Sequence, residues 1–169
     1  MRKWTTLLSA TAFVFAGLSL FAQAKIAVVD TMRVANESKE GKKIQATLKA
    51  HHDQKQAEIS TKEAALKALE EQGKDPKISD EKKEEIRTQF NQRLYEYQAF
   101  AKAAQDEMEA KTQKMQGEFQ EKLQRVIASY AEAKGFSIVV EKGICLYTAE
   151  TLEVTPDVLA KMNEAYPGA

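Results

Sequence analysis

The chain is poor in the residues that build catalytic and cofactor sites. Its 169 residues include seven glycines, three prolines, two histidines and one cysteine. The glycines are scattered, so neither a G-x-x-x-x-G-K-[ST] phosphate loop nor a G-x-G-x-x-G turn can be built. A single cysteine excludes an internal disulfide, and we interpret Cys145 as a small apolar residue in a strand. The sequence therefore predicts a protein that is not an enzyme and uses no cofactor.

The two histidines do not predict a metal site. His51 and His52 are neighbours in a helical stretch, and neighbouring helical side chains point about 100° apart, so they cannot share a metal on one face. Carboxylates are plentiful, but on solvated helices they lack the buried setting that shifts a pKa for acid or base catalysis. We expect no metal centre and no general acid or base.

Long apolar runs are absent except near the N-terminus. Residues 7–21 are largely apolar, Arg2 and Lys3 precede them, and Ala22-Gln23-Ala24 follows. This order is typical of a secretory signal with an A-x-A cleavage site. A retained membrane anchor is the alternative, but the run is shorter than the roughly 20 residues of a spanning helix. We predict that residues 1–24 are removed after Ala24 and that the protein is periplasmic.

No charge of one sign dominates the chain. The sequence has 25 Lys and Arg and 25 Asp and Glu, and loss of Arg2 and Lys3 leaves 23 basic residues (25 minus 2) against 25 acidic ones. A basic excess is what draws a protein onto nucleic acid or an anionic membrane. We therefore expect no nucleic-acid partner.

Two short apolar strands flank a long helical segment. Residues 25–30 and 136–141 read as strands, whereas 42–72 contain no glycine or proline and are rich in Ala, Glu, Lys, Gln and Leu, the strong helix formers. Gly73 and Pro76 interrupt the pattern and predict a turn over 72–79. A second helix should then run to about residue 134, before a glycine that provides a left-handed exit.

The C-terminal part returns to strand patterns. Residues 138–141 should form a hairpin with 144–147 through a turn at Lys142-Gly143. A last helix should begin with Thr155 as its cap and Pro156 at the first helical position. The fold class predicted is α+β, mostly α: a small β body at 25–37 and 135–169, and an antiparallel helical hairpin over 38–134.

The predicted body is too small to be stable alone. It contains about 48 residues, near the size at which a single core without cross-links is insufficient. Its short strands would also expose unpaired edges, so we predict a closed homo-oligomer with a shared β-barrel. Alternate strand positions give the predicted subunit contacts: Ile26, Val28, Ile138, Val140, Ile144 and Leu146. The opposite face is nearly as apolar, through Val29, Val139 and Cys145.

The helical hairpin has a thin apolar seam, padded with alanine and interrupted by polar residues. Such an arm should bend readily, because few large apolar contacts resist opening. Tyr95 and Phe100 fit the seam poorly, which leaves two interpretations: they shield the helix surface, or they contact an apolar client. The predicted client-contact residues are Leu66, Leu69, Ile86, Phe90, Tyr95 and Phe100.

Several segments together carry a resemblance to a known family. They are the predicted signal, the strand at 25–30, the helical hairpin, and the tail segments 138–147 and 154–162. The whole mature chain resembles the Skp/OmpH family of periplasmic chaperones. The resemblance implies a homotrimer in which a small β-barrel body carries three helical arms around a cavity. It also implies an ATP-independent holdase whose partners are unfolded outer-membrane β-barrel proteins.

The chain departs from this family in the charge of its arm tip. Family members are often strongly basic, with positive tips proposed to bind lipopolysaccharide. Residues 60–99 here carry about as many acidic as basic side chains. The sequence therefore does not predict binding to lipopolysaccharide or to a membrane surface. The alternative function is a structural coiled-coil spacer or adaptor in the cell envelope, with a fixed partner and a stiff arm.

Overall fold

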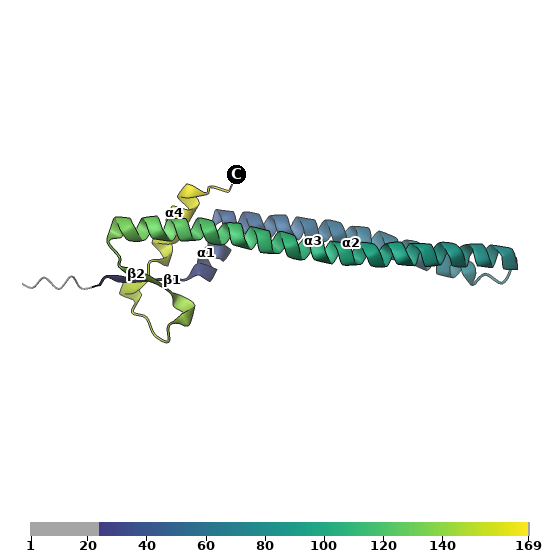
Figure 1. Ribbon diagram of the computed structural model, residues 1–169, viewed down its shortest axis with the longest axis horizontal. Helices are drawn as coiled ribbons and strands as arrows, with labels where there is room; N and C mark the ends of the chain where they lie inside the picture. Colours follow the sequence, from purple (N-terminus) through teal and green to yellow (C-terminus); the bar gives the residue numbers. More distant parts are fainter. Residues whose placement is uncertain (1–23, 169) are drawn as a thin grey trace, which may run out of the picture.

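The computed structural model describes residues 24–168, so residues 1–23 of the predicted signal lie outside the described residues. Figure 1 shows a long arm of two helices with a small body at one end. The elements in chain order are β1 (Ile26–Val29), α1 (Thr31–Glu37), α2 (Lys39–Gly73), α3 (Asp80–Lys134), β2 (Ile138–Glu141), the 3₁₀ turns Lys142–Ile144 and Glu150–Leu152, and α4 (Thr155–Ala165).

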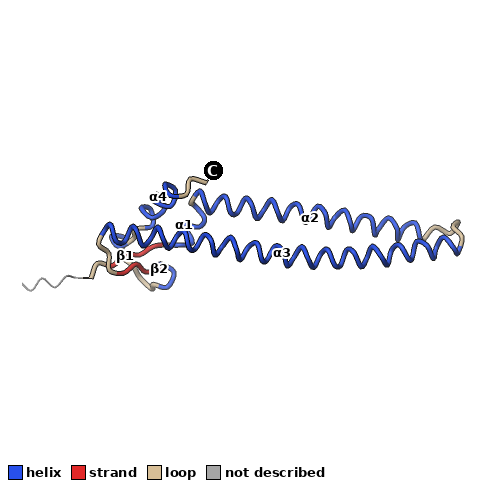
Figure 2. Tube along the Cα trace, turned by 45° about the horizontal axis from the view of Figure 1, so that its top comes forward, coloured by secondary structure: helices blue, strands red, loops and turns tan. Residues whose placement is uncertain are grey.

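The arm consists of α2 and α3, which lie side by side in two views (Figures 1 and 2). Each begins with a serine cap: the Ser38 hydroxyl accepts from the Gly41 amide, and the Ser79 hydroxyl accepts from the Lys82 amide. Gly135 ends α3 at φ 69°, the left-handed conformation expected of a glycine there. The arm thus begins and ends at the residues best suited to helix termini.

The body is organised around two parallel strands. Ile26 pairs with Ile138 and Val29 with Glu141, so the whole arm is the connection between the strands. Parallel pairing needs a crossover of at least a dozen residues, and here the crossover extends far from the sheet. At the edge of β1 opposite β2, the Val154 amide donates to the Val28 carbonyl and brings the start of α4 onto the strand.

One hydrophobic core joins the sheet, the root of α3 and α4. Met162, Val34 and Val158 are fully buried in it. The cluster consists of Ala27, Val29, Val34, Leu123, Val126, Tyr130, Val154, Val158 and Met162. Because α3 supplies three of these residues, the base of the arm is part of the body core.

The predicted hairpin after β2 is wrong. Residues 142–144 form a 3₁₀ turn, and 145–149 have no regular structure. The carboxylate of Glu141 explains the difference, because it accepts hydrogen bonds from the backbone amides of Gly143 and Thr31. These bonds hold the turn against α1, so the chain leaves the sheet at Glu141.

The start of α4 also differs by one residue from the prediction. Val154 occupies the cap position and Thr155 is the first helical residue. The Thr155 hydroxyl instead accepts a 2.9 Å hydrogen bond from the Asp30 amide. Thr155 therefore joins α4 to the end of β1 rather than capping its own helix.

Candidate functional site: the exposed strand face and the arm

The strand pair has one face in the core and one face directed away from it. Ala27, Val29 and Val139 belong to the core side. Ile26 and Ile138, which are paired in register, are 40% and 51% exposed, respectively. Of the two alternating faces that the sequence offers, the face of Ile26 and Ile138 is therefore the one available for contact with another chain.

The other predicted subunit-contact residues occupy different settings. Val28 and Val140 are also paired in register, but Val28 is buried within the subunit and Val140 is half-buried. Ile144 and Leu146 are exposed, in the 3₁₀ turn and the loop that follows rather than on a strand. The structure thus brings four of the six residues together on one sheet face and places the other two in the adjoining loop.

Three further exposed apolar side chains of the body could not be identified from the sequence pattern. They are Met32, Tyr147 and Leu152. Tyr147 was assigned to a strand that does not form, and Met32 and Leu152 lie in short helical turns where alternation carries no signal. Each of them adds exposed apolar area to the body and is a further candidate for contact with another molecule.

An ion-pair cluster joins the two ends of the segment that carries Tyr147 and Leu152. The Glu153 carboxylate lies 2.6 Å from Lys142 Nζ and 3.8 Å from the Arg33 guanidinium. The hydrogen bond from Lys142 is the main cause that lowers the pKa of Glu153, and it raises the pKa of Lys142 in turn. The loop is therefore tied at both of its ends to the body.

Three of the predicted client-contact residues meet near the end of the arm. Leu69 on α2 and Ile86 and Phe90 on α3 line a groove of about 210 Å³. Ile86 is buried there, whereas Leu69 and Phe90 are half-buried, as is Leu66 one turn before. Leu66, Leu69 and Phe90 therefore keep part of their surface accessible to another molecule, whereas Ile86 does not.

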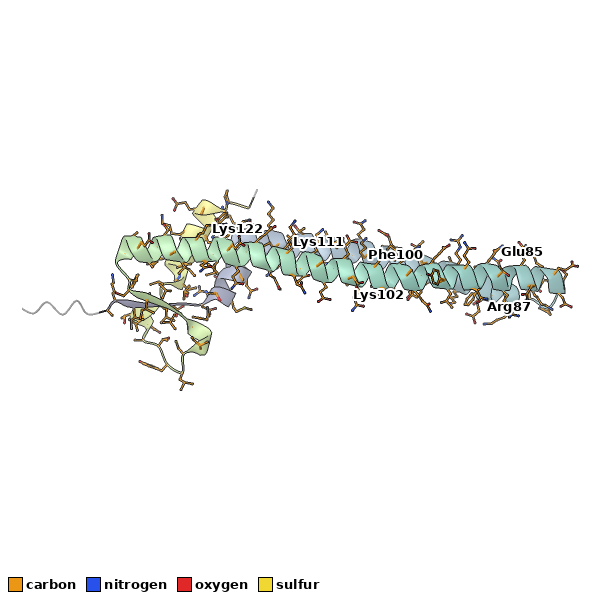
Figure 3. The ribbon with its side chains drawn as sticks, in the orientation of Figure 1. Glu85, Arg87, Phe100, Lys102, Lys111 and Lys122 are labelled. Atoms are coloured by element: carbon orange, nitrogen blue, oxygen red, sulfur yellow. The ribbon has the colours of Figure 1, made fainter. Side chains whose placement is uncertain are left out.

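The two poorly fitting aromatic residues differ from each other. Tyr95 is 75% exposed. Phe100, labelled in Figure 3, lies under two lysines of α2, with Lys62 Nζ 5.1 Å and Lys55 Nζ 5.6 Å from its ring centroid. Within the subunit, Phe100 supports the contact between the arm helices through cation–π interactions, and Tyr95 is the more accessible aromatic.

A polar cluster crosses the middle of the arm. Lys55 Nζ lies 2.9 Å from a Glu107 oxygen, and the hydrogen bond lowers the pKa of Glu107 and raises that of Lys55. Nε2 of His51 is 3.2 Å from the other Glu107 oxygen but makes no hydrogen bond, although it is buried. Across residues 24–168, no three His, Cys, Asp or Glu side chains are grouped as metal ligands would be.

Four basic residues at the arm tip are paired with nearby acids. Lys74 pairs with Glu70 at 2.6 Å, and Arg87 lies 3.5 Å from Glu84. Similar pairs join Lys82 to Glu85 and Lys83 to Asp80, and Figure 3 labels Glu85 and Arg87 in this part of the arm. Such short-range pairs leave little uncompensated positive charge to attract an anionic surface.

The architecture to be compared with known proteins is a small body of two paired strands that carries a two-helix arm. The family model "Outer membrane protein (OmpH-like)" matches residues 25–162, so the chain belongs to the OmpH-like family. Within the described part of the chain, no helix is both long and apolar enough to span a membrane.

Two relatives extend the match over nearly the full length. The chain is 24% identical over 166 residues to a Skp-like protein of Pseudomonas aeruginosa strain PAO1, covering 97% of this chain and 99% of the relative. The crystal structure of an OmpH-like outer membrane chaperone candidate from Caulobacter crescentus CB15 has a TM-score of 0.76 at 18% identity. That alignment covers 98% of this chain and 92% of the other, so the two proteins share one fold.

Proposed function

We propose that the protein is an ATP-independent holdase of the periplasm that binds unfolded outer-membrane β-barrel proteins and prevents their aggregation. Family membership supports the chaperone class. The observation that carries the proposal is the accessibility of the arm's apolar residues. Between residues 42 and 119, all described, Ile86 and Ala104 are the only apolar side chains that are buried.

The exposed sheet face supports assembly of several subunits. Ile26 and Ile138 on that face, together with Ile144 and Leu146 in the loop, would be covered by neighbouring copies. By family resemblance we propose a homotrimer in which the strands complete a shared barrel and three antiparallel hairpins leave one platform. A closed ring also removes strand edges that would otherwise pair with other chains.

Clustered arms would hold a client through many weak contacts. Leu66, Leu69, Ile86, Phe90, Tyr95 and Phe100 are the proposed contact residues. Each contact is weak, but once one arm has bound a client, the neighbouring arms meet that client at a high effective concentration. Release would then need no nucleotide, because the client leaves when it reaches a more stable state such as its folded barrel.

The test is protection of a denatured β-barrel. The mature chain, residues 25–169, is mixed in several-fold molar excess with a urea-denatured outer-membrane β-barrel that is diluted into buffer without nucleotide. We expect turbidity to be suppressed and the barrel to remain soluble. Unchanged turbidity would contradict the holdase function, whereas light scattering on the same sample checks the trimer separately.

A further inference from the structure

A groove lies in the middle of the arm, where α2 and α3 face each other. It measures about 560 Å³, and its apolar side consists of Ile59, Ala101, Ala104 and Met108. Ala104 is buried and the other three are half-buried. The two alanines explain the space, because larger side chains fill the seam on either side, including Phe90 and Phe119.

The rim of this groove is polar and carries two charged side chains, Lys55 and Glu109. Lys55, which borders it, is compensated by Glu107 at 2.9 Å. The amide groups of Gln56 and Gln105 also border it, and among the described residues neither has a hydrogen-bond partner. Each side-chain amide provides two donors and one acceptor. The groove therefore combines an apolar floor with uncharged groups that can bond to a peptide backbone.

We propose that this mid-arm groove binds an extended segment of unfolded chain in which apolar and uncharged polar residues alternate. This inference rests on the proposed holdase function. From Ala101 to Thr112 the groove extends roughly 16 Å along α3 at 1.5 Å per residue, which matches about five residues of extended chain at 3.3 Å each. Alternate side chains of such a segment would lie on the floor while its backbone meets Gln56 and Gln105.

The chemistry of the floor selects a class of segment rather than one sequence. The unbranched thioether of Met108 adapts its shape to different apolar side chains, and Ala101 and Ala104 present no fixed pocket. Strands of membrane β-barrels have the required alternation, with apolar residues facing lipid and polar residues facing the lumen. Acidic segments are disfavoured, because Lys55 is already paired with Glu107 and Glu109 adds a negative charge to the rim.

Site-specific crosslinking on the full mature protein tests the location. The photoreactive p-benzoylphenylalanine replaces Gln105 on the rim or, as a matched control, Ala103, which is exposed elsewhere on α3. The probe is a fluorescein-labelled nonapeptide of alternating Val and Thr, compared with a peptide of the same composition whose valines form one block. We expect labelling at 105 to exceed labelling at 103, and the alternating peptide to label more than the blocked one. Equal labelling at both positions, or no labelling by the alternating peptide, would overturn the proposal.

Filling the groove provides the second test. Ala101→Leu places a larger side chain on the floor, whereas Ala103→Leu makes the same change on the exposed surface. We expect peptide binding by fluorescence anisotropy to weaken roughly four- to tenfold in A101L, because displaced apolar groups are worth about fourfold per CH₂, and to be unchanged in A103L. Equal peptide affinities in the two variants, both with normal circular dichroism, would contradict binding at the groove.

If wild-type protein fails to keep a β-barrel soluble, the holdase function fails, and peptide binding still decides whether the groove is a site.

Discussion

The hydroxyl of Tyr130 on α3 donates a 2.6 Å hydrogen bond to a carboxylate oxygen of Asp157 on α4. The Tyr130 ring is buried in the body core and stacks against Phe136, with centroids 6.0 Å apart. One residue at the root of the arm therefore contacts the last helix and the segment that leads into β2. This arrangement fixes the direction in which α3 leaves the body.

Replacing Tyr130 by Phe should lower the free energy of unfolding by about 1 kcal/mol, the typical value of one such hydrogen bond. The ring contacts remain, and Asp157 is exposed and can be solvated, so the loss should not be larger. Urea unfolding followed by circular dichroism measures it. The control is Tyr95→Phe, because Tyr95 is 75% exposed and this change should leave stability unaltered. An equal loss in both variants would show that the Asp157 bond contributes nothing.

Alkaline pH should destabilise the wild-type protein through the same residue. Burial, and then the bond to Asp157, raises the pKa of Tyr130 to about 12, above the ordinary value of about 10. The folded state favours the neutral phenol, so this contribution is complete below about pH 10 and is lost as pH rises towards 12. The stability difference between wild type and Tyr130→Phe should therefore narrow above pH 10. A difference that stays constant up to pH 11 would contradict the raised pKa.

Two glycines in the arm helices should respond oppositely to alanine. A Cβ on Gly41 would lie 1.8 Å from the Ala35 carbonyl oxygen, whereas one on Gly117 would meet nothing within 4 Å. Gly41→Ala should destabilise the protein by about 3 kcal/mol or more, because the backbone where α1 meets α2 must move. Gly117→Ala should stabilise it by up to about 1 kcal/mol through helix propensity. Thermal melts of both variants compare the effects, and a stable Gly41→Ala protein would show that the junction is not tightly packed.

The outward sheet face gives a prediction about assembly. Ile138→Lys places a charge on that face, where Ile138 is half exposed in the subunit, so it should weaken self-association at least roughly tenfold without unfolding the subunit. Light scattering over a concentration series measures the change. Tyr95→Lys, on the arm and away from the body, is the matched control and should assemble as the wild type does. Unchanged assembly of Ile138→Lys would place the subunit contact elsewhere.

Elements with strong local signals could be predicted from the sequence. The helical arm follows from helix propensity and from the glycine that ends α3, and the two distant strands follow from their short apolar runs. The missing strand at 144–147 could not be predicted, because its side-chain alternation is real but Glu141 directs the backbone into a 3₁₀ turn. That choice depends on a contact with Thr31, which lies 110 positions away.

Of the two arm grooves, the one near the tip could be predicted from the sequence and the one in the middle could not. Leu69, Ile86 and Phe90 meet at one groove because they lie on the apolar seam, which periodicity reveals. The mid-arm groove was not predicted, because a groove between helices arises where side chains are small, and alanines read only as padding in a sequence. The choice between the two strand faces likewise required α3 and α4, whose packing covers Val29 and Val139.

The parallel pairing of β1 with β2 has a consequence for the order of folding. A strand near residue 26 cannot find its partner near residue 138 by a local search, since closing so long a loop is entropically unfavourable. Once α2 and α3 have packed together from their turn, however, the start of α2 and the end of α3 lie at the same end of the molecule (Figure 2). We therefore expect the arm to form before the body, so that amide protection in pulsed hydrogen exchange appears in α2 and α3 ahead of β1. In this order of folding, the arm brings β1 and β2 close enough to pair.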